Sequence, residues 1–487
     1  MHANIGQHNA SPTGVCMNPD FKLPSQCNPK LTRRKVLQLG GMSMLAGAGF
    51  GSLLQAGSKT NSGNNKAKSV ILVNLFGGPS HIDTFDMKPD APKEIRGEFK
   101  SIASKIPGYQ ICEHLPLIAN RLDKATLIRT VSHGYNSHNP YSVLTGFTGG
   151  SDRENYFAKP SDHPSMAAVC QHFGMGKEAT PFHVMMPAFP GFSQGLRRAG
   201  PYGGYLGKQY DPITTMCEPA YARKGSFYDP VLPVGDPVLA AFGQTPGLSL
   251  DRIADRKRLQ RKMDDVSKKI GDPAKSANLT RQQKQAYDLL TSSGVRTALD
   301  LDMEPSLLRE RYGKNLYGSS LLAARRLVEA GVTFVTVNWE CGADSHGGHW
   351  DMHNNNFGML KFNLPILDTM VTALMDDLET RGLFDSTLVI VTGEMGRTPK
   401  INGSAGRDHW PQCGFCLLFG AGVKKGFVLG TSDKQAAYPV DHPVSPGDLC
   451  ATVYSLLGID SEAVVHDTLG RPTAISHGGR PIQSILG

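Results

Sequence analysis

The strongest chemical signal in this 487-residue chain is a carboxylate and an imidazole separated by one residue. Asp351 and His353 fall in a polar loop after a predicted strand, so both side chains can reach one ion from a single turn. Imidazole nitrogen and carboxylate oxygen are the usual ligands of zinc, manganese or magnesium-type sites. The pair therefore predicts a metal site.

Other candidate groups stand at similar places, after apolar runs that are typical of strands. Residues 70–76, 125–131 and 387–392 are three such runs. The groups that follow them are His81, Asp83, Ser137, His138, Glu394, Arg397 and His409, and Asp344, His346 and His349 precede Asp351 in its own loop. Ligands bind at the carboxyl ends of the strands in open α/β sheets, so we expect these groups at one rim.

Each candidate also has a structural interpretation. Residues 77–80 are typical of a tight turn, and Asp83 would cap a following helix. Ser137 and His138 would form a local turn bond, and the histidines near Trp350 would be stacked surface groups. The glycine-rich segments contain no phosphate-binding G-x-x-x-x-G-K motif, which argues against a nucleotide P-loop.

The segments that must position these groups alternate between strands and helices. Apolar runs at 332–337 and 417–419 add further strands, and apolar residues at helical spacing predict helices over 319–330, 364–378 and 448–457. This alternation predicts an α/β fold with a doubly wound, mostly parallel sheet and helices on both faces. Residues 250–312 are charged and predict an inserted helical layer or cap.

The N-terminal segment has the pattern of an export signal. Residues 32–38 read Thr-Arg-Arg-Lys-Val-Leu-Gln, and residues 36–54 are apolar and uncharged. This pattern is typical of a signal peptide for the twin-arginine translocase, which predicts an exported, periplasmic or secreted protein. The alternative is an uncleaved membrane anchor, although its many glycines weaken that interpretation. We expect a leader over 1–56, a flexible linker over 57–68 and one domain over 69–487.

Charge and cysteine content exclude other classes. Half of the net charge of +8 comes from residues 1–56, and no basic block follows, so we expect no nucleic-acid partner. The nine cysteines are scattered, unlike a disulfide framework. Cys413 and Cys416 form a lone C-x-x-C that runs into an apolar strand, which favours buried core cysteines over a zinc ribbon. A redox role for this pair is the weaker alternative.

Four segments resemble the domain-of-unknown-function 1501 family. They are residues 75–86, residues 350–353 (Trp-Asp-Met-His), residues 393–399 (Gly-Glu-Met-Gly-Arg-Thr-Pro) with 406–410 (Gly-Arg-Asp-His-Trp), and residues 448–458. The resemblance extends over residues 69–487. This family is grouped with the alkaline phosphatase and sulfatase superfamily, which implies an alkaline-phosphatase-like fold and a metal site for phosphate or sulfate esters.

The resemblance also implies roles for particular residues. Ser80, His81 or Asp83 stands where the superfamily has a metal-binding Asp. Residues 136–140 replace the sulfatase nucleophile motif, and Glu394 with Met395 replaces an Asp-His pair. The pair at 351 and 353 resembles the superfamily's Asp-x-x-x-His with altered spacing, and the histidine at 409 matches the final metal ligand.

These observations predict an exported hydrolase of phosphate or sulfate esters that uses a divalent ion (zinc, manganese, magnesium or calcium). The roles are divided as follows: Asp351, His353 and His409 bind one ion; Glu394, with His81 or Asp83 and His138, binds a second ion or supports the first; Ser137 or a water attacks the ester; and Arg397 neutralises the anionic substrate. The alternative is a catalytically inactive, exported binding or scaffold protein on the same fold.

Overall fold

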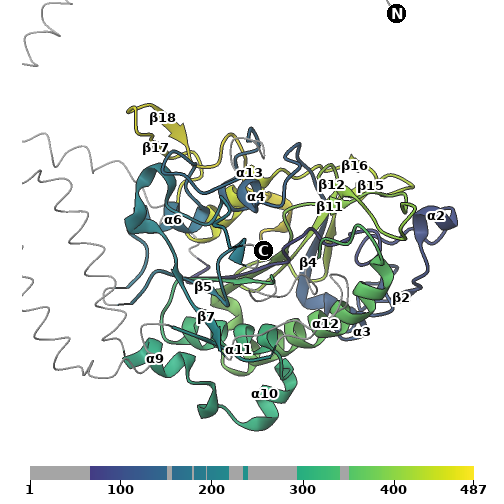
Figure 1. The fold of residues 1–487 in the computed structure, drawn as a ribbon, viewed down its shortest axis with the longest axis horizontal. Helices are drawn as coiled ribbons and strands as arrows, with labels where there is room; N and C mark the ends of the chain where they lie inside the picture. The colour runs from purple at the N-terminus through teal and green to yellow at the C-terminus, as the bar shows by residue number, and fades with distance from the viewer. Residues whose placement is uncertain are drawn as a thin grey trace, which may run out of the picture. The chain divides into compact units, whose positions relative to one another are not determined.

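A central sheet of eight strands is built largely from the apolar runs (Figure 1). The computed structural model describes residues 66–150, 156–177, 180–192, 195–218, 234–239, 293–340 and 350–487. The strands are β1 (Ser69–Asn74), β4 (Ala125–Val131), β5 (His183–Met186), β6 (Ile213–Thr214), β9 (Phe334–Asn338), β10 (Thr387–Thr392), β13 (Gly414–Phe419) and β14 (Phe427–Leu429). Their order across the sheet is β14-β4-β13-β10-β1-β9-β5-β6.

The sheet is mostly parallel. Strand β1 lies at its centre and pairs in parallel with both β9 and β10. Strand β13 runs antiparallel to both of its neighbours, β10 and β4, so that β4 points the same way as β1. The carboxyl ends of β1, β4, β9 and β10 therefore lie at one edge of the sheet, which is where α/β proteins place their ligands.

Helices cover both faces of this sheet (Figure 1). Alternate residues of β1 enter different cores: Ile71 and Val73 pack with residues of α11 (Leu316–Glu329) and α12 (Asn356–Thr380). Val70 and Leu72 pack with residues of α6 (Met166–His172) and α13 (Pro446–Leu456) on the other face. This period of two on a strand buried on both sides confirms the predicted doubly wound α/β class.

The long predicted segments are confirmed, and their ends differ. Strand β10 spans the six residues of its apolar run, whereas α12 begins eight residues earlier than the predicted start at 364 and includes Pro365. The described end of the predicted insertion contains α9 (Ser293–Leu299) and α10 (Ser306–Tyr312). Cys413 and Cys416 are both buried and free, the latter on β13.

All described residues belong to one compact unit, Ser58–Gly487. The leader, most of the linker, residues 250–292 of the insertion and the loop residues Asp344, His346 and His349 lie outside the described part of the chain. The boundaries of leader, linker and insertion therefore stay predictions. Within the described residues, no helix combines the length and the apolar character needed to cross a membrane.

Candidate metal centre

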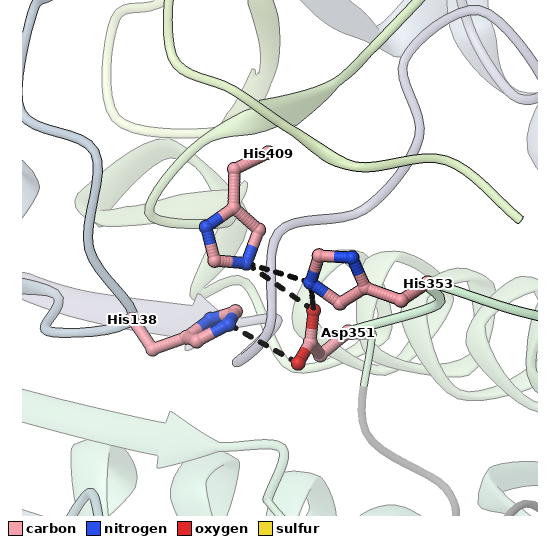
Figure 2. Close-up of side chains that lie close together, drawn as sticks. All are labelled: His138, Asp351, His353 and His409. Atoms are coloured by element: carbon pink, nitrogen blue, oxygen red, sulfur yellow. Dashed lines mark hydrogen bonds and ion pairs between the residues drawn. The ribbon is translucent and has the colours of Figure 1, made fainter. Parts of the chain in front are cut away.

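Four side chains from three parts of the chain converge at the carboxyl edge of the sheet (Figure 2). His138 comes from the loop after β4, and Asp351 and His353 lie between β9 and α12. His409 lies on β12 (His409–Trp410), which pairs with β11 (Gly396–Arg397) in a hairpin beyond β10. One ligand atom from each residue lies within 4.8 Å of the others, a spacing that suits a single ion.

Asp351 is the centre of the group. Its Oδ2 lies 3.1 Å from Nε2 of His138, and its Oδ1 lies 3.0 Å from Nε2 of His353. Nε2 of His409 is 3.4 Å from the same Oδ1. The carboxylate therefore contacts the Nε2 atom of every imidazole in the group.

The three imidazoles share one arrangement, in which Nδ1 faces an oxygen acceptor. The pairs are His138 with Glu394 Oε1 at 3.1 Å, His353 with Asp408 Oδ1 at 2.7 Å, and His409 with Asn136 Oδ1 at 3.1 Å. An Nδ1 that donates to oxygen leaves Nε2 with a lone pair in the neutral ring. Partners of this kind fix the tautomer and orientation of histidines that bind metals.

The consequence is that four electron-rich atoms face one another. Nε2 of His353 lies only 3.0 Å from Nε2 of His409, and Asp351 adds a negative charge beside both. Such atoms repel unless a proton or a cation lies among them. Three nitrogens and one oxygen also fit zinc and similar ions better than magnesium or calcium, which prefer oxygen ligands alone.

The pKa values of His138 and Asp351 reflect the close approach of these groups. Burial lowers the pKa of His138, but hydrogen bonds to Asp351 and Glu394, together with their charges, outweigh burial and raise that pKa to about 9. Burial opposes ionisation of Asp351, yet its bonds to the three imidazoles and the charge of Arg397 hold its pKa well below the usual range. At neutral pH the centre therefore holds a proton on His138 when no ion is bound.

Arg397 is fully buried and touches the centre through Asp351. Its Nη2 lies 2.6 Å from Oδ1 of Asp351, Nε donates to the carbonyl of Gly78 at 2.8 Å, and Nη1 donates to the carbonyl of Arg407 at 3.1 Å. Nη2 also donates to the carbonyl of Gly77. Its donors are thus directed to the protein, in a position that orients Asp351.

Three predicted metal residues lie outside the group of four: Glu394, which contacts Nδ1 of His138, and the more distant Asp83 and His81. Asp83 is completely buried and forms a two-pronged ion pair with Arg407, at 2.6 Å and 2.8 Å, and it also accepts from Ser80 and Asn356. These donors occupy its oxygens, so its contacts are those of a structural ion pair. His81 is also buried, and its Nε2 lies 2.7 Å from the carbonyl of Ala436.

Ser137, the predicted nucleophile, is 1% exposed. Its Oγ accepts from the backbone and the side-chain nitrogens of Asn139, both at 3.1 Å.

Sequence reasoning did not assign Asn136 or Asp408 as partners of the histidines. Asp408 is next to His409 in the chain and so had a sequence signal, whereas nothing in the sequence pairs Asn136 with a histidine 273 positions away.

The model of the family described as "Protein of unknown function (DUF1501)" matches residues 67–486. The chain belongs to this family. No curated protein matches it.

Solved structures resemble the chain at low identity. A phosphonate monoester hydrolase from Silicibacter pomeroyi is 11% identical, with a TM-score of 0.35, and the match covers 86% of this chain and 76% of that one. A sulfatase from Pseudoalteromonas sp. is 12% identical (TM-score 0.35; 82% and 69% covered). The soluble domain of lipooligosaccharide phosphoethanolamine transferase A from Neisseria meningitidis is 10% identical (TM-score 0.37; 82% and 90% covered).

The hairpin loop that presses on His353 gives a first prediction. A Cβ at Gly406 would lie 2.0 Å from the carbonyl carbon and oxygen of His353, whereas a Cβ at Gly403 in the same loop meets nothing within 4 Å. We expect Gly406→Ala to displace His353, to lower zinc affinity and to destabilise the fold by about 1–3 kcal/mol. Zinc titration and urea unfolding measure both effects. Gly403→Ala is the matched control and should change neither; equal behaviour of the two variants would contradict the packing described.

The pH dependence of ion binding gives a second prediction. The pKa of His138 is raised to about 9, and the hydrogen bond to Asp351 raises the pKa of His353 as well, so an ion that binds at pH 7 must displace at least the proton of His138. Zinc affinity should therefore rise with pH below 9, by about tenfold per unit for one displaced proton. Calorimetry in two buffers of different ionisation enthalpy should detect release of at least about one proton at pH 7. Affinity that does not vary between pH 6 and pH 8 would contradict this account.

Proposed function

We propose that this chain is an exported, metal-dependent hydrolase of phosphate or sulfate esters. The observation that carries the proposal is that three imidazole nitrogens and one carboxylate lie close enough together to bind a single ion. The four side chains are 19–38% exposed, so a small substrate can approach from solvent. Four protein ligands are also the number found in structural zinc sites, so catalysis requires that the ion accept a water or an ester oxygen in addition to these four.

The chain's own residues would organise the reaction. His138, Asp351, His353 and His409 would hold a divalent ion, which would supply Lewis-acid chemistry to an ester oxygen or a water. Asp351 would neutralise one of the two charges of a divalent ion, and the charge that remains would favour an anionic ester over a neutral one. Arg397 keeps Asp351 in place, because its donors are shared between that carboxylate and backbone carbonyls.

We favour water over Ser137 as the attacking group. Ser137 is buried and its Oγ is engaged by Asn139, so an ester cannot reach it without a rearrangement of this loop. His138, the next residue, is directed into the centre instead. In this proposal Ser137 holds the loop that carries His138.

The substrate class and the location rest on sequence features. The resemblance to the alkaline phosphatase and sulfatase superfamily makes phosphate and sulfate esters the first substrates to test. The twin-arginine pattern at residues 32–38 supports export through the twin-arginine translocase. That route carries folded proteins, which suits a centre assembled from residues more than 200 positions apart in the chain.

The proposal predicts a defined set of variant activities. Zinc added to chelator-treated protein should bind with one ion per chain and restore hydrolysis of aryl phosphates or aryl sulfates. Asp351→Ala and His409→Ala should lower kcat/KM by at least about a hundredfold, since each removes a metal ligand. Ser137→Ala should retain most of the activity if water attacks.

Two results would contradict the proposal, and they differ in meaning. A chain that binds no divalent ion, with stability unchanged in Asp351→Ala and His409→Ala, has no metal centre. A chain that binds one ion and leaves both substrate classes untouched is instead the inactive binding or scaffold protein.

Lys314→Ala is a suitable control for the ligand variants, because Lys314 is an exposed side chain that pairs with Glu310 on the surface.

A further inference from the structure

We propose that Glu394 is a positioning residue of the metal centre: its buried carboxylate holds His138 with Nε2 toward the ion and increases the ring's strength as a ligand. This inference rests on the metal centre of the proposed function. In this inference Glu394 orients a residue that binds the ion. It does not itself bind a second ion, which was the role predicted from the sequence.

The geometry places Glu394 behind His138, on the side away from Asp351. Its Oε1 accepts from Nδ1 of His138 at 3.1 Å and from the backbone N–H of Gly77 at 2.7 Å. The opposite ring nitrogen, Nε2, lies 3.1 Å from Oδ2 of Asp351. One imidazole is therefore held on both sides by carboxylates, and its orientation leaves Nε2 for the ion.

Both ends of Glu394 are anchored. It lies two residues after the end of β10, and its backbone carbonyl accepts from Nε2 of His133 at 2.9 Å. The N–H of Gly77 that reaches its side chain belongs to a turn with φ of +114°, where a Cβ would lie 2.3 Å from the backbone nitrogen of Asp351. Glycine is required there, and the same turn packs against the segment that carries the central ligand.

The burial of Glu394 argues for a functional role. Its side chain is 0% exposed, and Oε2 has no hydrogen-bond partner among the described residues. A buried carboxylate with an unsatisfied oxygen costs folding free energy, and an uncharged side chain would avoid that cost. Groups kept at such a cost are commonly those that tune a site.

The other two histidines have weaker partners. Asp408, which faces His353, has a side chain that is 52% exposed and also receives a bond from Asn402. Asn136, which faces His409, is exposed and uncharged. Water competes for exposed acceptors and screens their charge, so His138 is the ligand whose orientation depends most on its partner.

The test compares Glu394→Gln with Asp408→Asn in the full-length chain. Gln keeps an oxygen that can accept from His138 and Gly77 but removes the charge. We expect zinc affinity to fall about 10–100-fold in Glu394→Gln and by a smaller factor in Asp408→Asn. We also expect the visible absorption bands of the Co²⁺-substituted protein to shift in Glu394→Gln, because the ligand field at His138 changes.

Asp368→Asn is the matched control. Asp368 is likewise a buried carboxylate, and it accepts from the backbone nitrogens of Leu117 and Ile118 at 2.8 Å and 2.7 Å. It takes no part in the group of four, so its replacement should leave zinc affinity and the Co²⁺ spectrum unchanged even if the unfolding temperature falls.

The outcomes separate this inference from the proposed function. Folded Glu394→Gln with wild-type zinc affinity and a wild-type Co²⁺ spectrum would overturn it. So would a lower unfolding temperature in Glu394→Gln with ion binding unchanged, since that result defines a purely structural role. If the wild-type chain binds neither Zn²⁺ nor Co²⁺, the metal centre itself is wrong and both proposals fall.

Discussion

The arrangement at the carboxyl edge depends on one ion pair, between the buried Arg397 and the partly exposed Asp351. The guanidinium joins three segments: its own strand β11, the glycine turn after β1, and the loop after β9 that carries Asp351. A planar group with donors in fixed directions can link several acceptors in this way, whereas a lysine ammonium is a flexible point charge. Because Asp351 in turn contacts all three imidazoles, the position of this carboxylate sets the geometry of the whole centre.

A second constraint follows from the partners of the imidazoles. Each Nδ1 faces an oxygen, so the Nε2 lone pairs converge beside a carboxylate. That convergence is unfavourable in an empty, unprotonated site and becomes favourable when a cation is present. Three contacts hold the imidazoles in these positions. Glu394 is buried behind His138, Gly406 packs closely against His353, and the paired strands β11 and β12 carry His409.

Much of this could be predicted from the sequence. The strands at 69–74, 125–131 and 387–392 are continuous apolar runs, and the groups that follow such runs in an α/β sheet meet at one edge. This rule placed His138 and His409 among the candidates, the one-residue separation of Asp351 and His353 added that pair, and the family resemblance supported the pair and His409. Short strands such as β6 and β14, of two and three residues, carry too little pattern to be recognised.

Pairings between distant residues were beyond sequence reasoning. Asp83 stands after the first strand, as a metal ligand would, but Arg407 lies 324 positions away and forms an ion pair with both of its oxygens. Arg397 has the chemistry of a substrate-binding residue, and only the fold directs its donors to Asp351 and backbone carbonyls. Residue type and position along a strand predict which groups lie at the same edge of the sheet. Tertiary contacts decide which of these groups are available to bind an ion or a substrate.

The most direct test of the central claim is a crystal structure of the zinc-loaded protein with data collected on both sides of the zinc absorption edge. The account predicts one anomalous peak per chain, at about 2.0–2.1 Å from Nε2 of His138, His353 and His409 and at a similar distance from an oxygen of Asp351. A peak bound by Asp83, His81 or the paired Cys413 and Cys416, or no peak at all, would contradict it.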